Sequence, residues 1–171
     1  MKLYQFKVSI IGVPKLYRII EASGNCTFND LHEKIFEAFN RYDPHLYSFF
    51  ITKSDTKSIR SIIKAPEITH PENTEDFIGF GKKKMSTAKT KIDNARLEEK
   101  DVFHYLFDFG DDWWHRILVQ SIKEIEQKLK KGASFIEMAK KYSEDPGSKT
   151  KGGDVGWMKY NTPFVNSFKK A

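Results

Sequence analysis

The chain has 171 residues, a formal net charge of +6, and a composition that is 39% hydrophobic and 30% charged. This length and balance indicate a folded protein with a sizeable core and exclude a disordered chain. No apolar run reaches the roughly 20 residues that a membrane span needs, and no signal-peptide core follows Met1, so the sequence predicts a cytoplasmic protein. The single cysteine, Cys26, excludes an internal disulfide and a multi-cysteine zinc site.

The N-terminal stretch predicts a pair of strands. Apolar and polar side chains alternate over residues 4–10, as in a strand with one face against a core. Gly12-Val13-Pro14 then turns the chain, and residues 16–21 form a second strand that pairs with the first.

A helix and a third strand are predicted next. Thr27, followed by Asp30 three residues later, has the pattern of a capping box at a helix start. The positions that follow place apolar side chains at helical spacing: Phe28, Leu31, Ile35, Ala38 and Phe39. The cluster Arg41-Tyr42-Asp43-Pro44 ends the helix, and residues 45–52 predict the third strand.

Residues 53–100 are polar and show no clear periodicity, which indicates an ordered excursion from the sheet. The run Lys82-Lys83-Lys84, with Lys89 and Lys91 after it, has the charge to contact the phosphates of a nucleic acid. A solvated loop is the commoner explanation for such a run.

Residues 101–122 predict a β-hairpin on which the rest of the chain is organised. Aromatic side chains occupy one parity of its first half: Phe103, Tyr105, Phe107 and Phe109. Gly110-Asp111-Asp112 makes the turn, and Trp113 and Trp114 follow it. Two aromatic rings beside two carboxylates are suited to stack on a ligand or to hold a basic peptide. Alternatively, the tryptophans pack on the sheet edge while the aspartates serve the turn.

After the hairpin, the apolar period changes from two to between three and four, which predicts two short helices. Ser121 with Glu124 and Ser134 with Glu137 have the capping-box spacing, and Gly132 is placed to end the first helix.

Three segments within residues 3–122 resemble the plasmid pRiA ORF-three-like family. The resemblance implies an α+β domain over residues 1–122, with a polar excursion at residues 53–100. It implies a mixed or mainly antiparallel sheet, one long N-terminal helix and a central β-hairpin; no biochemical activity is established for the family. The matching segments are FKVSIIGVPKLYRIIE, TFNDLHEKIFEAFNRYDPHLYSF and YLFDFGDDWWHRI.

Residues 123–171 are similar to a parvulin-type peptidyl-prolyl isomerase, through LKKGASFIEMAKKYSEDPGS and then GGDVGW. Parvulins twist an X-Pro bond, whose barrier is about 18–20 kcal/mol, by desolvating and distorting the amide. The resemblance implies that Asp145 takes the place of the family's Cys or Asp and that His115 is the first histidine. It places Phe168 in the substrate pocket, and Met158 is expected to contact substrate beside it.

The parvulin-like segment is incomplete, because the sequence ends before two strands and a second histidine that the family has. We therefore weigh two functions: an isomerase-like protein acting on proline-containing peptides, and a non-catalytic peptide- or nucleic-acid-binding module of mobile-element origin. In the second, Trp113 and Trp114 contact the partner. No metal ion, cofactor or membrane partner is expected, and the sequence does not predict the oligomeric state.

Overall fold

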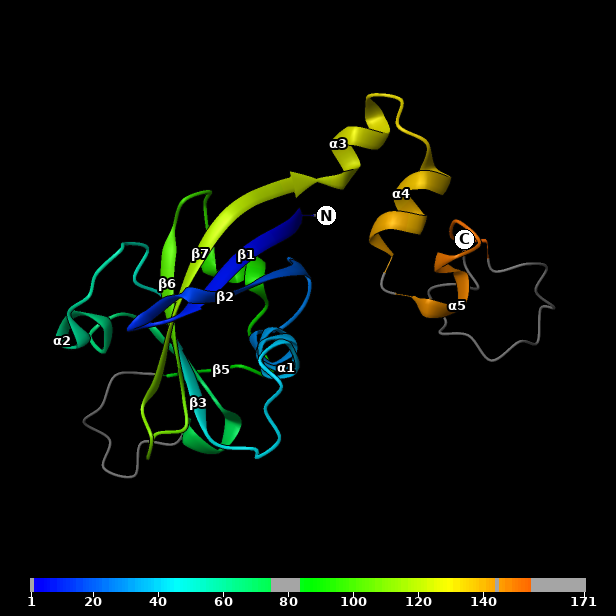
Figure 1. Ribbon diagram of the computed structural model, residues 1–171. Helices are drawn as coiled ribbons and strands as arrows, with labels where there is room; N and C mark the ends of the chain where they lie inside the picture. The colour runs from blue at the N-terminus through cyan, green and yellow to red at the C-terminus, as the bar shows by residue number, and fades with distance from the viewer. Residues whose placement is uncertain (1, 75–83, 144, 155–171) are drawn as a thin grey trace. The chain divides into compact units, whose positions relative to one another are not determined.

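A computed structural model describes residues 2–74, 84–143 and 145–154 of the chain (Figure 1). The chain divides into two compact units, Met1–Glu124 and Ile125–Ala171. Within the described residues, no helix is both long and apolar enough to cross a membrane.

The first unit is built on a mixed sheet in the order β2-β1-β7-β6-β3-β4-β5. Every neighbouring pair is antiparallel except β4 and β5, which are parallel. The predicted central hairpin is present as β6 and β7. The strands span Lys2–Ile10 (β1), Val13–Ser23 (β2), Tyr47–Phe50 (β3), Glu67–Thr69 (β4), Met85–Ser86 (β5), Val102–Phe107 (β6) and Trp113–Glu124 (β7).

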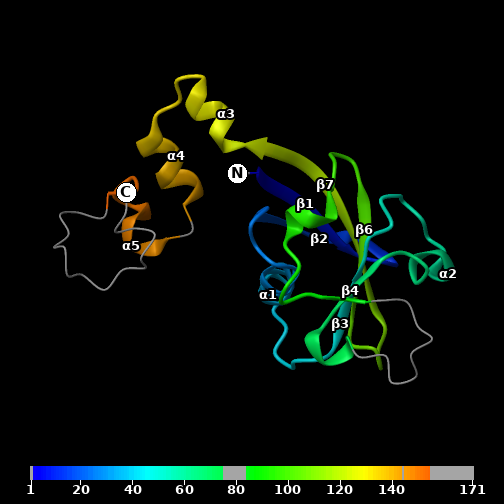
Figure 2. The same ribbon diagram turned by 180° about the vertical axis from the view of Figure 1, so that it is seen from behind.

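Helix α1, Phe28–Ala38, packs on one face of this sheet (Figures 1 and 2). It begins with the predicted capping box, in which the Thr27 side chain accepts from the Asp30 backbone and the Asp30 side chain accepts from the Thr27 backbone. The expectation of one long N-terminal helix is wrong, because the chain starts with two paired strands and α1 has 11 residues. The alternation over residues 2–23 favours strands, and the chain leaves the helical conformation at Asn40, where φ is 52°.

The main core lies between α1 and the sheet and is rich in aromatic rings. Phe103, Tyr105 and Phe107 of β6 all point into it, as their shared parity predicts. Phe28 of α1 contacts Phe49 and Phe103, with ring centroids 5.1 and 6.3 Å away. Each fully buried ring contributes about 1.5–3 kcal/mol relative to an exposed one, so this cluster accounts for much of the stability of the first unit.

Part of the excursion between β3 and β6 covers the opposite face of the sheet, whereas its residues Ile68, Ile92 and Leu97 belong to the main core. Ile62 of helix α2, Ile59–Ile62, is buried against Phe50 and Leu106. The other described elements of the excursion are β4, β5 and two 3-10 helices, η1 (Pro71–Asn73) and η2 (Ile92–Ala95).

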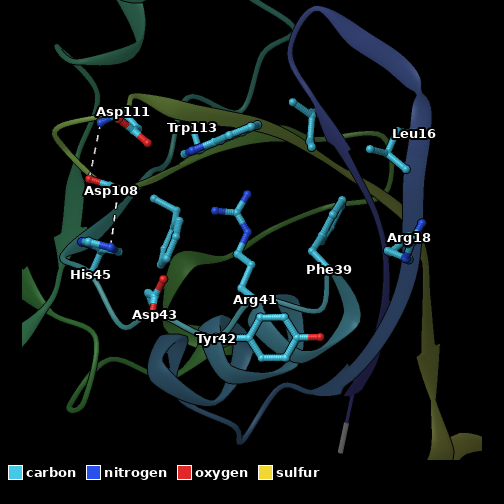
Figure 3. A pocket seen from close by; sticks show the side chains of 12 residues that line it. Leu16, Arg18, Phe39, Arg41, Tyr42, Asp43, His45, Asp108, Asp111 and Trp113 are labelled. Carbon is cyan, nitrogen blue, oxygen red and sulfur yellow. Dashed lines mark hydrogen bonds and ion pairs between the residues drawn. The ribbon is translucent and has the colours of Figure 1, made fainter.

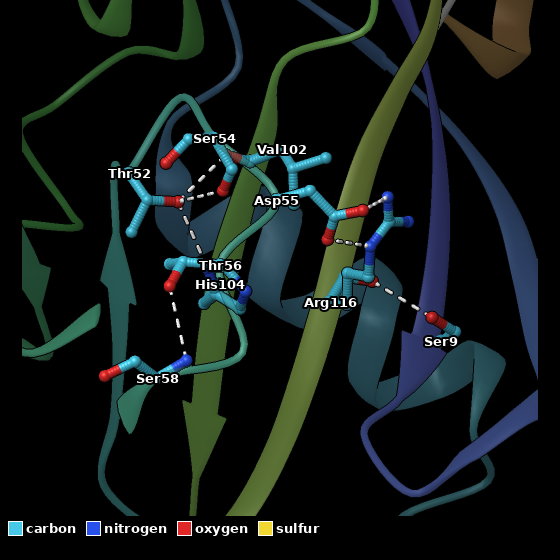
Figure 4. Close-up of polar contacts among 9 residues, drawn as sticks. All are labelled: Ser9, Thr52, Ser54, Asp55, Thr56, Ser58, Val102, His104 and Arg116. Atoms are coloured by element: carbon cyan, nitrogen blue, oxygen red, sulfur yellow. Dashed lines mark hydrogen bonds and ion pairs between the residues drawn. The ribbon is translucent and has the colours of Figure 1, made fainter. Parts of the chain in front are cut away.

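An ion pair fixes the start of the excursion over the sheet (Figure 4). Arg116 of β7 donates two hydrogen bonds to the carboxylate of Asp55, at 2.7 and 2.8 Å. The hydroxyl of Thr52 donates to the backbone carbonyl of Val102 and lies 3.1 Å from Nδ1 of His104. His104 is therefore part of the packing of this face.

The described part of the second unit contains three short helices, α3 (Ile125–Lys130), α4 (Phe135–Tyr142) and α5 (Pro146–Lys149). Ser134 caps α4 as predicted, and Gly132, with φ of 91°, follows α3. Gly153 lies so close to Phe135 and Ala139 of α4 that a larger residue would displace them. The loop after α5 therefore packs directly on α4.

The predicted helix start at Ser121 is wrong. Ser121 pairs with Gln5 in the sheet, and β7 continues to Glu124 before α3 begins. The reason is tertiary, because strand β1 supplies a partner for every residue of this stretch except one at a bulge, and these ladder bonds outweigh the local capping pattern.

Candidate functional site

An open cleft of about 460 Å³ lies on the first unit, where three segments meet (Figure 3). The β1–β2 hairpin supplies Leu16 and Arg18, and the hairpin of β6 and β7 supplies Phe107 and Trp113. The third segment runs from the end of α1 to β3 and contributes Phe39, Arg41, Tyr42, Asp43 and His45.

The end of α1 turns the chain into this cleft. The N–H of Arg41 donates to the carbonyl of Phe36 at 3.1 Å, and the N–H of Asn40 donates to that of Glu37 at 2.9 Å. This pair of bonds, with Asn40 at positive φ, is a Schellman motif. The motif fixes the direction of the backbone at the point where Arg41 leaves the helix.

The side chain of Arg41 stands at the centre of the cleft (Figure 3). Its guanidinium carbon lies 4.3 Å from the ring centroid of Phe107 and 5.3 Å from that of Trp113. One terminal N–H group donates a hydrogen bond of 3.0 Å to Nε2 of His115, since a guanidinium has no acceptor. Two aromatic faces and one imidazole therefore hold the cation in place.

His115 is fully buried beneath Arg41 and is neutral at physiological pH. Burial, and next the positive charge of Arg41, lower its pKa from 6.5 to about 4. Because Nε2 accepts from Arg41, the ring proton resides on Nδ1. His115 thus positions the guanidinium and has no charge of its own to offer a ligand.

The other charged groups of the cleft are partly occupied. Arg18 donates to the backbone carbonyls of Ala38 and Tyr17, at 2.8 and 3.0 Å. The carboxylate of Asp108 accepts from the N–H of Gly110 at 2.9 Å in the hairpin turn and lies 3.6 Å from His45 (Figure 3). The cleft therefore combines a cationic centre with an acidic rim.

A family model described as plasmid pRiA4b ORF-3-like protein matches residues 2–151. The chain belongs to this family. The match runs beyond residue 122, where the sequence alone placed the end of the family resemblance. A crystal structure of a protein of unknown function, MM3350 from Methanosarcina mazei Go1, resembles this pRiA4b ORF-3-like chain with a TM-score of 0.56 and 25% identity. The likeness covers 78% of this chain and 66% of the other.

This pRiA4b ORF-3-like chain is also similar in part to foldases and chaperones. The foldase protein PrsA of Bacillus subtilis (strain 168) is 36% identical over 94 residues, which are 53% of this chain and 32% of PrsA. PrsA of Geobacillus sp. (strain WCH70) is 53% identical over 115 residues, or 66% of this chain and 36% of PrsA. The chaperone SurA of Saccharophagus degradans is 49% identical over 49 residues, 29% of this chain and 11% of SurA. The chain thus spans about a third or less of these relatives.

The structure places Trp113 and Trp114 apart, although the sequence left open whether they form one binding surface or pack on the sheet edge. Trp113 lines the cleft and is 43% exposed, whereas Trp114 packs on Phe50 at the opposite face, with ring centroids 5.6 Å apart. Adjacent residues of a strand point to opposite faces, which accounts for the separation. In the turn, the side chain of Asp108 accepts from the N–H of Gly110, and Asp112, at φ of 54°, donates its N–H to the carbonyl of Asp108 at 2.8 Å.

The residues expected to form an isomerase site fall in both units. His115 belongs to the first unit, and Asp145 belongs to the second, where it caps α5. The Asp145 carboxylate accepts from the N–H of Ser148 at 2.8 Å and from its hydroxyl, and these bonds lower its pKa. Met158 and Phe168 lie outside the described residues.

The histidines of the first unit do not gather. His32 hydrogen-bonds the hydroxyl of Tyr105 at 2.8 Å, His104 contacts Thr52, and His45 lies beside Asp108. In the part of the chain that the structure describes, no three His, Cys, Asp or Glu side chains are placed to share a metal ion. Of the lysine run, Lys84 is described and lies 3.7 Å from Glu67 in an ion pair.

Sequence reasoning missed Arg41 as a site residue. We interpreted Arg41-Tyr42-Asp43-Pro44 as a stop signal for α1, which it is, but the same segment also supplies the centre of the cleft. An arginine directly after an Asn at a helix end was the available signal, because a Schellman motif sets the direction of the residue that follows.

Proposed function

We propose that this protein binds peptides in the cleft of its first unit. The observation that carries the proposal is the open cleft in which the buried ring of Phe107 and the exposed ring of Trp113 hold the guanidinium of Arg41. The partial similarity to proteins named foldase and chaperone supports the same class of ligand.

The lining of the cleft has the composition of a peptide-binding surface. Leu16 and Trp113 are 40% and 43% exposed, and Tyr42 is 86% exposed, so apolar area remains for a ligand to cover. Tyr, Trp and Arg dominate the affinity of protein–peptide contacts because they combine large apolar area with a polar end. The cleft thus has the side chains expected where a peptide docks.

The proposal is tested by fluorescence anisotropy with a labelled nine-residue synthetic peptide that contains Leu, Tyr, Phe and Pro. We expect saturable binding with a Kd between about 1 μM and 1 mM, the range of weak recognition in an open site. Absence of any anisotropy change at millimolar protein concentration would overturn the proposal. The bound peptide should also shield Trp113 from solvent. This is measured as reduced quenching of tryptophan fluorescence by iodide.

Prolyl isomerisation is the second candidate function. The partial similarity to PrsA and SurA favours it, together with the SEDPGS and GGDVGW motifs of the second unit. Its proposed residues in the second unit are Asp145 for catalysis and Met158 and Phe168 on the substrate; His115 is fully buried in the first unit. A protease-coupled assay on an Ala-Pro peptide tests it: a rate equal to the uncatalysed one rejects catalysis and leaves the peptide-binding proposal in place.

A further inference from the structure

We infer that the cleft selects ligands that carry a carboxylate, which the guanidinium of Arg41 binds. The inference rests on the proposed function, because it names the group that a bound peptide must present. The carboxylate can belong to the C-terminus of the peptide or to an acidic side chain.

Among the described residues Arg41 has no direct ion pair, and the nearby carboxylate of Asp108 offsets its charge only from a distance. The side chain of Arg41 is half-buried, and among the described residues no carboxylate lies within ion-pair distance of it. Its hydrogen-bond partner, His115, is neutral, and burial lowers the pKa of the arginine itself. Because a desolvated cation is costly unless it is paired, a bound anion would stabilise this arrangement.

The contacts of Arg41 within the protein leave several of its N–H groups for a ligand. The aromatic faces of Phe107 and Trp113 contact the cation, and aromatic faces satisfy its charge only weakly. His115 accepts from one terminal nitrogen, so the N–H groups of the remaining nitrogens are left for recognition. A guanidinium binds a carboxylate through two parallel N–H groups, and one that is already held loses little entropy on binding.

The second arginine of the cleft is less suited to this role, because its Nε and one terminal nitrogen already donate to the protein. Arg18 donates to the carbonyls of Ala38 and Tyr17, which fixes it at the end of α1. Arg41 is therefore the cation that meets the ligand.

The acidic rim favours a carboxylate over a phosphate. Asp43, Asp108 and Asp111 line the same cleft, so a second negative charge on the ligand adds attraction to Arg41 but also repulsion from three carboxylates. A carboxylate satisfies Arg41 with the smaller repulsion. Basic groups elsewhere on the peptide would be attracted by Asp43 and Asp111.

Four peptides of one nine-residue sequence test the inference by anisotropy. The first has a free C-terminus and an internal Gln, the second is amidated with Glu in place of that Gln, the third is amidated with Gln, and the fourth is amidated with phosphoserine. We expect the first or the second to bind at least roughly tenfold more tightly than the third, as a charge-assisted pair predicts, and the stronger one identifies the source. The phosphoserine peptide should bind less tightly than the better carboxylate peptide.

The outcomes separate this inference from the proposed function. Equal affinity for the first three peptides, or tightest binding of the phosphoserine peptide, overturns carboxylate selection while peptide binding stands. No binding of any peptide rejects both. Arg41→Gln should remove the preference for the carboxylate, Arg41→Lys should restore part of it, and Arg60→Gln on α2, an exposed arginine outside the cleft, should leave it unchanged.

Discussion

The guanidinium of Arg41 donates to Nε2 of His115 across 3.0 Å, and this bond connects the cleft to the buried core. The ring of His115 lies 5.1 Å from that of Tyr105, whose hydroxyl in turn bonds Nδ1 of His32 at 2.8 Å. Two neutral histidines, His115 and His32, thus lie on either side of Tyr105 under the site, and their protonation would add positive charge near Arg41. The pH dependence of folding follows from this arrangement.

Lowering the pH from 7 to 5 should destabilise the first unit. Burial lowers the pKa of His115 to about 4 and that of His32 to about 3, whereas both titrate near 6.5 in the unfolded chain. Between pH 6.5 and these folded values the unfolded state binds more protons, so the free energy of unfolding falls as the pH falls. We expect a loss of about 1–2 kcal/mol per histidine, measured by urea unfolding at the two pH values.

His32→Phe provides the control for this pH effect. It removes one of three buried histidines with a lowered pKa, His32, His104 and His115, so the difference in unfolding free energy between pH 7 and pH 5 should shrink by about a third to a half, whatever the variant does to stability at pH 7. A difference identical to that of the wild type would show that His32 does not titrate with a lowered pKa.

Trp113→Ala should weaken peptide binding by roughly tenfold, because the indole supplies exposed apolar area in the cleft and one of the faces that hold Arg41. Phe109→Ala is the matched control, since Phe109 is a 39% exposed aromatic residue of the same hairpin that does not line the cleft. Anisotropy titrations should therefore show the roughly tenfold loss of affinity in Trp113→Ala and no loss in Phe109→Ala. Equal weakening in both would point to a general loss of surface apolarity.

Asn40 lies just after the end of α1, so the effect of a substitution there on the free energy of unfolding should depend on how easily the new residue adopts a positive φ. The residue has φ of 52°, which glycine adopts freely and alanine does not. We expect Asn40→Ala to lower the free energy of unfolding by about 1 kcal/mol and Asn40→Gly to leave it within about 0.5 kcal/mol of the wild type. Urea unfolding measures both, and the alanine variant should also lose affinity for the carboxylate peptide because Arg41 is displaced.

Much of the first unit could be predicted from sequence because its signals are local. The alternation of residues 4–10 and the parity of Phe103, Tyr105 and Phe107 gave β1 and β6, and Thr27 gave the start of α1. In each case the pattern and the tertiary environment favour the same conformation.

The remaining features depend on contacts between residues far apart in the sequence. Ser121 has a helix-capping pattern but lies in β7, because β1 offers ladder bonds that no local pattern reveals. The excursion over residues 53–100 has no periodicity, since side chains such as Ile62 are buried one at a time. The cleft was missed for the same reason: Arg41 and His115 are 74 residues apart and meet through the fold.

Gly24→Ala should destabilise the first unit by about 2 kcal/mol. A Cβ at this position would overlap the carboxylate of Asp93, which accepts a hydrogen bond of 2.8 Å from the hydroxyl of Tyr4. Overpacking of this kind typically costs about 1–3 kcal/mol. A double-mutant cycle with Asp93→Ala checks the cause, because the alanine at position 24 should be much better tolerated once the carboxylate is gone; additive effects would contradict it.

Asp145 should act in the second unit as the cap of α5, and an asparagine should replace it in that role. Its carboxylate accepts from the N–H and the hydroxyl of Ser148, and Asn is as good a helix cap as Asp. We expect faster amide exchange at Ser148 in Asp145→Ala and near wild-type exchange in Asp145→Asn, measured by NMR. The same two variants separate the two roles of Asp145 if the protein also isomerises prolyl bonds. If catalysis needs the charge of the carboxylate, Asp145→Asn loses isomerase activity while the amides of α5 stay protected. If the carboxylate acts only as a cap, Asp145→Asn keeps the activity and Asp145→Ala loses it.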